Sequence, residues 1–289
     1  MTSEADRDLT AAITRVALSV HAPDEFRSAA HAVARTLGPG AAEQLADQFH
    51  RAPQPPPAEF GPQADTFSGR IAWMQAWQAA SFELLYHLGP AALPVLRRVA
   101  FGGYDWTQIH AIQTLVRLAT DGVQPVELAR ELAGALPTFR YEALFSVLPA
   151  LATLRPPIPE LIQALEQQFT EHQGDPADAI TVLACLAEYA PEPARAHVDF
   201  LRQAMRGRGL EHRHPLLDGA VLIQREGKEE VAWGPRGAPP ADQHAIRAAR
   251  LLRHLIPGDP EAEARLQEWA DHHPDEGVRS ELRRVLGDK

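Results

Sequence analysis

The feature that most constrains the fold of this chain is a pair of helical segments that recurs along it. The clearest copy is LGPAALPVLRRVAF at 88–101, followed by a Gly-Gly break and DWTQIHAIQTLVRLATDG at 105–122. Leu88-Gly89-Pro90 and the Ala-rich apolar spacing after it predict one helix, and Asp105 is the type of residue that caps a second, antiparallel one. Because one such pair cannot bury its apolar face alone, a series of related pairs predicts a stacked, all-α fold.

The second helix of each pair can be aligned on a small residue that is followed, four positions later, by a large apolar one. The first three copies are spaced by 32 and 36 residues. The alignment joins Ala111 to Leu115, Ala143 to Val147, Ala179 to Leu183 and Ala248 to Leu252. At this spacing the small side chain lets a neighbouring helix approach closely, while the large one fills the next gap. We therefore expect these to be packing positions.

In these pairs the chain resembles the HEAT-repeat family. The segments that carry the resemblance are 88–101, 106–122 and DEGVRSELRRVLGD at 275–288. The resemblance covers about 66–289 and implies an α-solenoid of antiparallel helix pairs, whose second helices line a concave surface. The chain departs from the family pattern in its irregular spacing and in an incomplete Asp and Arg ladder, which Arg279 fits and Ile109 does not.

Three regions follow from the distribution of proline and apolar residues. Residues 1–50 form an N-terminal group of predicted helices, at 9–20, 24–37 and 41–50, with Asp24 as the cap of the second. Residues 51–65 contain five prolines, which cannot continue a helix, so we expect an exposed, extended linker or loop there. Residues 66–289 hold the repeat array.

A long apolar helix is predicted at 66–88. Trp73, Trp77, Phe82 and Tyr86 recur three to five residues apart in it and describe one face. The preferred interpretation is core packing, because aromatic side chains bury large areas. The alternative is an aromatic wall that binds a ligand.

The array is interrupted by an insertion at about 225–241. One interpretation is a small β-hairpin over VLIQREGKEEVAW, with Gly227 at its turn. The other, slightly preferred, is a helix at 216–224 that completes a degenerate repeat, followed by a loop or a small hairpin. Either insertion would project from one face of the array and contact a partner.

Charge and composition exclude several classes of function. The formal net charge is −10, which argues against sequence-independent attraction to nucleic acid. Local arginine clusters remain, but arginines on helices usually pair with carboxylates; the clusters contain Arg195, Arg202, Arg206 and Arg208, then Arg247, Arg250, Arg253, Arg279, Arg283 and Arg284. No apolar run is long enough for a membrane span, and the N-terminus lacks the features of a signal peptide.

The same composition favours a cytoplasmic protein of a GC-rich bacterium. The single cysteine, Cys185, lies on an apolar helix and is expected to be buried and unreactive. The closely spaced histidines lack the helical spacing that would direct two imidazoles at one ion, so we expect no metal and no cofactor. No catalytic signature occurs, and no catalytic residue is assigned.

Candidate binding residues come from the repeat register. The residues just before the aligned alanines are His110, Glu142, Asp178 and Arg247, which would form a row on successive second helices. Arg117 flanks this row, and Trp106 is a candidate buried anchor for a partner. The functional interpretation is a polar concave groove with an acidic centre. The alternative is an ordinary solvated helix face.

Two functions remain in competition. The first is a non-enzymatic scaffold or adaptor that binds a protein partner on the concave face. The second is a HEAT-like nucleic-acid-binding protein or alkylbase DNA glycosylase, a family whose members use aromatic residues and a carboxylate, as Tyr104-Asp105-Trp106 could provide. For this tripeptide, however, we expect Asp105 to cap a helix and Trp106 to pack.

Overall fold

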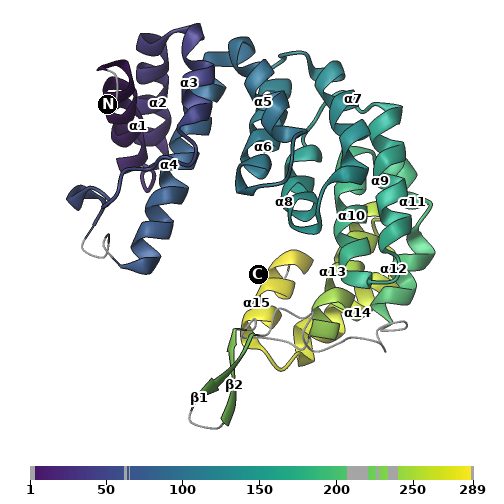
Figure 1. The fold of residues 1–289 in the computed structure, drawn as a ribbon. Helices are drawn as coiled ribbons and strands as arrows, with labels where there is room; N and C mark the ends of the chain where they lie inside the picture. Colours follow the sequence, from purple (N-terminus) through teal and green to yellow (C-terminus); the bar gives the residue numbers. More distant parts are fainter. Residues whose placement is uncertain are drawn as a thin grey trace. The chain divides into compact units, whose positions relative to one another are not determined.

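The computed structural model describes residues 4–61, 64, 66–206, 221–225, 228–233 and 240–287. Apart from one two-stranded hairpin, the regular structure in these residues is helical, which confirms the predicted class (Figure 1). The chain divides into two compact units, Met1–Leu161 and Ile162–Lys289. None of the described helices is both long enough and apolar enough to cross a membrane.

Short connections join the helices of both units. The first unit contains α1 (Glu4–Leu18), α2 (Pro23–Leu37), α3 (Ala42–Asp47), α4 (Phe67–Leu88), α5 (Leu93–Ala100), α6 (Trp106–Thr120), α7 (Pro125–Ala135) and α8 (Tyr141–Leu151). α9 (Pro159–His172) begins just before the division between the units. The second unit continues with α10 (Pro176–Tyr189), α11 (Pro191–Arg195), α12 (Val198–Met205), β1 (Val221–Arg225), β2 (Lys228–Trp233), α13 (Pro240–Leu255), α14 (Pro260–His272) and α15 (Glu276–Leu286).

Aspartate caps begin several of these helices. Asp105 accepts a hydrogen bond from the Thr107 amide at 2.6 Å, as predicted for the start of α6. Asp175 accepts one from the Ala177 amide at 2.9 Å at the start of α10. These bonds satisfy amides that have no partner inside the helix.

The cap predicted at Asp24 is wrong. α2 begins at Pro23, one residue earlier, and the preceding Ala22 makes no side-chain capping bond. Proline is favourable at a first helical position because its backbone angle is already helical and it has no amide hydrogen to satisfy. α2 ends at Leu37, just before Gly38, which has a φ of 73°.

The packing positions predicted from the repeat alignment are confirmed. All four aligned alanines and the four large residues that follow them have no exposed surface: Ala111, Leu115, Ala143, Val147, Ala179, Leu183, Ala248 and Leu252. Each pair lies on the inner side of its second helix, in α6, α8, α10 or α13. The alanines let neighbouring helices approach closely, as the i to i+4 spacing predicted.

In the first unit α4 packs against α1, α2 and α6, and α6 in turn packs against α5, α7 and α8. The contacts between α4 and α6 advance in the same direction along both helices. The ring of Phe82 stacks on His110 with 5.4 Å between centroids, and further along both helices the Tyr86 hydroxyl donates a hydrogen bond to Asp121. α4 and α6 therefore run parallel.

The proline-rich segment 51–61 contacts α4, but Arg51, Gln54, Pro55, Ala58 and Glu59 are exposed, so the expected exposure holds for part of it. The indole nitrogen of Trp73 donates to the Pro53 carbonyl at 3.0 Å, and that of Trp77 donates to the Gln48 carbonyl at 2.6 Å. Both tryptophans are fully buried, which confirms the packing interpretation of the aromatic face. The prolines prevent this segment from forming an α-helix, and the indole hydrogen bonds attach it and the residues before it to α4.

The insertion contains a hairpin. Strands β1 and β2 pair antiparallel, from Val221 opposite Trp233 to Arg225 opposite Lys228. The preferred prediction of a helix at 216–224 is therefore wrong for 221–224, and the alternative of a hairpin is confirmed. The expected turn at Gly227 lies outside the described residues. The run VLI contains two β-branched residues, which favour strands over helices.

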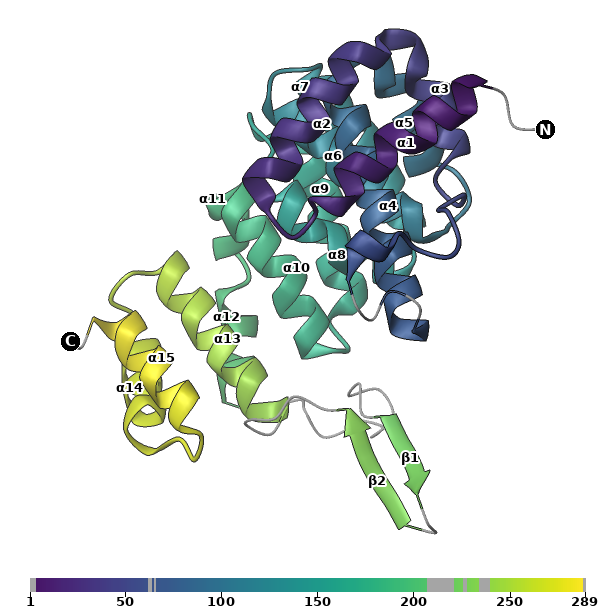
Figure 2. The same cartoon turned by 90° about the vertical axis from the view of Figure 1, so that its left-hand side faces the viewer.

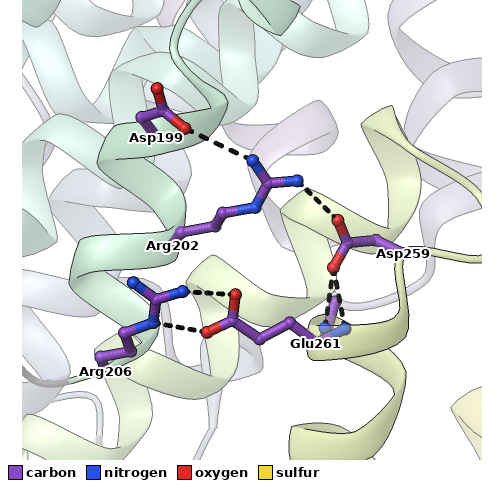
Figure 3. A network of polar contacts seen from close by, with 6 residues as sticks. Asp199, Arg202, Arg206, Asp259 and Glu261 are labelled. Carbon is purple, nitrogen blue, oxygen red and sulfur yellow. Dashed lines mark hydrogen bonds and ion pairs between the residues drawn. The ribbon is translucent and has the colours of Figure 1, made fainter.

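In the second unit α13 packs against α10, α12 and α14, and α14 packs against α15 (Figure 2). An ionic network joins α12 to the start of α14 (Figure 3). Arg202 donates to Asp259 at 2.9 Å and to Asp199 at 3.3 Å, and Arg206 forms a two-pronged pair with Glu261 at 2.5 and 2.6 Å.

Asp259 is the central residue of this network. Its side chain is 4% exposed, and it also accepts hydrogen bonds from the amides of Glu261 and Ala262, at 3.1 and 3.0 Å. Burial by itself would raise the pKa of this carboxyl, but the Ala262 amide and the Arg202 guanidinium outweigh that effect and lower the pKa. The same carboxylate thus caps α14 and attaches it to α12.

Replacing Asp259 with Ala should lower the free energy of unfolding by about 2 kcal/mol, because the change removes a buried cap and leaves Arg202 without that partner. The midpoint of urea unfolding at pH 7 measures the loss. Asp199→Ala is the matched control, because it removes a partner of the same arginine that is 89% exposed. If the two substitutions lowered the free energy of unfolding equally, the buried cap would contribute no more to stability than the exposed partner does.

Candidate functional site

Trp106 is the most exposed large aromatic side chain on α6, with 67% of its surface accessible. The expectation that it packs is therefore wrong. Its ring lies 6.4 Å from that of Tyr104, and the guanidinium of Arg140, from the residue before α8, lies 5.1 Å from the Tyr104 centroid. We call Tyr104, Trp106 and Arg140 the Trp106 patch.

The chain before α6 fixes the position of this patch. Gly102 allows a tight turn after α5, since a Cβ atom there would lie 2.6 Å from the Arg98 carbonyl oxygen. Asp105 then caps the helix, which places Trp106 at the first helical position. A side chain at this position lies at the end of the helix, where no preceding turn can cover it.

Asp105 is occupied by its capping role. Its Oδ1 accepts from the amide and the hydroxyl of Thr107, and its Oδ2 lies 3.4 Å from Nε2 of His50. A polar pocket of about 290 Å³ surrounds this group, with Asp47 and Arg98 also in its lining. A glycosylase would need this carboxylate to act beside the aromatic rings, but its Oδ1 is directed back at its own helix and its Oδ2 faces His50.

His110 lies one turn after Trp106 and is half-buried. Burial lowers its pKa, which favours the neutral imidazole at pH 7. Its ring stacks on Phe82 and lines an open pocket of about 410 Å³. The other lining residues come from α4 and from the turn between α1 and α2; they are Val20, His21, Ala72, Gln75, Ala76 and Ala79.

Arg117 is engaged within the fold. It forms a two-pronged pair with Glu83 at 2.6 and 3.0 Å, and its guanidinium lies 3.8 Å from the centroid of the Tyr86 ring. Burial would raise the pKa of Glu83, but His87 and Arg117 outweigh it and lower the pKa to about 2. Arg117 therefore joins α6 to α4, and its predicted role toward a partner would require breaking this pair.

The four residues of the predicted row divide between the two units. Glu142 is exposed in the first turn of α8, in the same unit as His110. In the second unit, Asp178 lies 3.9 Å from His172 Nδ1, and Arg247 donates to the Thr181 hydroxyl at 2.8 Å. Partial burial lowers the pKa of Arg247, and the negative charge of nearby Asp178 opposes this shift. Asp178 and Arg247 are thus neighbours in the second unit, whereas His110 and Glu142 lie on α6 and α8 of the first.

The arginine clusters pair with carboxylates, as expected for helix surfaces. The described pairs include Arg195 with Glu192, Arg202 with Asp259, Arg206 with Glu261, Arg250 with Glu281, Arg253 with Glu263 and Arg279 with Glu276. Arg208 lies outside the described residues. These pairs neutralise the charge of the arginines named here locally.

Several charge pairs join residues about one repeat apart, and the sequence prediction missed them. The separations are 34 residues for Glu83 and Arg117, 34 for Arg97 and Glu131, 30 for Arg130 and Glu160, and 31 for Arg250 and Glu281. The signal available in the sequence was the recurrence of opposite charges at a separation of about one repeat period. The alignment on small residues did not use it.

Cys185 is buried in α10, and burial raises the pKa of its thiol to about 12. A thiol in this state is a weak nucleophile at neutral pH. In the part of the chain that the structure describes, no three His, Cys, Asp or Glu side chains gather as a set that could hold a metal ion.

Comparison with known proteins gives no relative: no protein-family model, no curated protein and no solved structure matches this chain.

Replacing Glu83 with Gln should lower the free energy of unfolding at pH 7 by about 3 kcal/mol, as follows from a pKa near 2 in the folded state. A depressed pKa stabilises the fold above the unfolded-state pKa, and this contribution is lost as pH falls toward 2. The deficit of the variant should therefore shrink between pH 5 and about 2. Urea unfolding at several pH values measures it.

Glu127→Gln is the matched control, because this side chain is 63% exposed and should have little effect at any pH. A deficit in Glu83→Gln that stayed constant down to pH 2 would contradict the ionic origin of the effect.

Proposed function

We propose that this protein is a non-enzymatic interaction scaffold that binds a protein partner through the Trp106 patch. The observation that carries the proposal is the 67% exposure of Trp106 beside Tyr104 and Arg140. Tryptophan, tyrosine and arginine are the residues that most often dominate binding energy at protein interfaces. A large exposed indole on a rigid helix end loses little conformational freedom on binding and gains much buried area.

The architecture that we propose is a HEAT-like α-solenoid. Three features support it: the parallel course of α4 and α6, the buried alanines at repeat spacing, and the ion pairs that span one repeat. Such arrays bind partners over extended surfaces built from successive second helices. Glu142 would extend the Trp106 patch along α8, because it lies two residues after Arg140.

The features of the site favour protein over nucleic acid as the partner. The net charge is −10, and the described arginine clusters are paired with carboxylates. Asp105 caps α6 through Oδ1, so a glycosylase would have to act through Oδ2, which lies beside His50. A protein surface with an apolar recess and an acidic rim would complement the indole and Arg140.

Trp106→Ala should abolish capture of the principal partner when the tagged protein is incubated with lysate of its native host. The reason is that the change removes the central apolar anchor without touching a buried contact. Quantitative mass spectrometry of the retained proteins measures the effect, and circular dichroism confirms that the variant is folded. Arg140→Ala should weaken the same capture severalfold.

Arg27→Ala is the control, since it truncates another large side chain, 61% exposed, on a different helix and outside both proposed surfaces. It should leave that capture unchanged. Retention of the same proteins at the same level by folded Trp106→Ala would rule out the Trp106 patch as the binding site.

A further inference from the structure

A second surface on the first unit lies on α4. Phe67, Ile71, Met74, Gln78 and Phe82 follow one another at intervals of four, three, four and four residues and form one continuous stripe of the helix. The two ends of this stripe differ. Gln78 and Phe82 are each 4% exposed, whereas Phe67, Ile71 and Met74 are 81%, 37% and 39% exposed.

Neighbouring elements cover the C-terminal half of the stripe. The ring of Phe82 stacks on Phe49 at 4.4 Å and on His110 of α6 at 5.4 Å. The N-terminal half has the same apolar character and lies beyond this cover. The stripe of α4 that packs against α6 thus extends toward the N-terminus of α4, beyond the residues that α6 covers.

The open pocket of about 410 Å³ is lined by residues of the same helix, among them Gln75 and Ala79, which follow Met74 and Gln78 of the stripe in sequence. Its floor is the alanine-rich side of α4, with Ala72, Ala76 and Ala79 at helical spacing. Small side chains let a second helix approach the axis of α4 closely, and the ridge of Phe67, Ile71 and Met74 would then pack along its flank. The few polar groups of the lining, His21, Gln75 and His110, suit a peptide better than a polar small molecule.

The charge of this surface is opposite to that of the whole protein. α4 contains no carboxylate before Glu83, and its formal charge over 67–82 comes from Arg70 alone. The pocket lining has no carboxylate either. The N-terminus of α4, a helix of 22 residues, adds a partial positive charge at the same end. A chain of net charge −10 therefore presents here an apolar face whose charge complements an anionic ligand.

We propose that this face, formed by Phe67, Ile71, Met74 and the adjoining pocket, binds an amphipathic helix of a partner protein that has an acidic polar face. The apolar residues of that helix, at i, i+4 and i+7, would pack on the ridge and enter the pocket. Its carboxylates would lie toward Arg70 and the start of α4. This surface is separate from the Trp106 patch, and the proposal does not rest on the function proposed for that patch.

The test uses the full chain and three synthetic peptides of the same length. Each has the same leucine stripe at helical spacing, and the polar face is Glu-rich, Gln-rich or Lys-rich. Fluorescence anisotropy measures binding of each labelled peptide. We expect the Glu-rich peptide to bind most tightly. The double variant Ile71→Gln, Met74→Gln should weaken its binding at least tenfold, because it makes the ridge polar; both side chains are more than one third exposed, and circular dichroism checks that the variant folds.

Charge and location are tested by three further variants. Arg70→Glu should reduce the preference for the Glu-rich peptide at least threefold, whereas Arg35→Glu, the same change at an exposed position of α2, should not. Trp106→Ala should bind the peptide like the parent protein, so a failure of this proposal is distinct from a failure of the Trp106 patch.

Three results would overturn the proposal. The first is the absence of saturable binding by the Glu-rich peptide. The second is tightest binding by the Lys-rich peptide, which would mean that the overall negative charge governs the contact. The third is a dimer in analytical ultracentrifugation that the Ile71→Gln, Met74→Gln variant abolishes, which would assign the face to a second copy of this chain.

Discussion

Close approach of neighbouring helices is the constraint on which both units depend. Ala111 and Ala143 in the first unit, and Ala179 and Ala248 in the second, are fully buried, and each is followed four residues later by a buried large side chain. Any larger side chain at the alanine positions would separate the helices and open gaps beneath the large residues. The same packing rule, a small residue followed four positions later by a large one, therefore holds in helices of both units.

Polar contacts then select one arrangement among those that the apolar packing allows. Glu83 and Arg117 join α4 to α6, Arg97 and Glu131 join α5 to α7, and Asp259 attaches α14 to α12. Buried or half-buried pairs of this kind penalise a wrong register, because a shifted helix would leave a charge without its partner. They also neutralise the charge of the arginines that take part in them.

Both proposed binding surfaces lie where this packing stops. Trp106 is exposed because it begins α6, and Phe67 is exposed because α4 extends beyond the helix that covers its C-terminal half. Helix ends and overhanging turns are not covered by the neighbouring helix, so apolar residues placed there remain available to another chain. The candidate interaction sites are thus consequences of unequal helix lengths in the first unit.

The sequence by itself determined the helical class, the aspartate cap of α6, and the buried face that carries Trp73 and Trp77, because these depend on local spacing and residue type. It could not determine that Trp106 is exposed, that 51–61 packs on α4, or that 221–225 is a strand. Those outcomes depend on which surfaces meet in space. An indole at a helix start is equally compatible with burial and exposure. Only the tertiary structure decides whether a neighbouring helix reaches far enough to cover it.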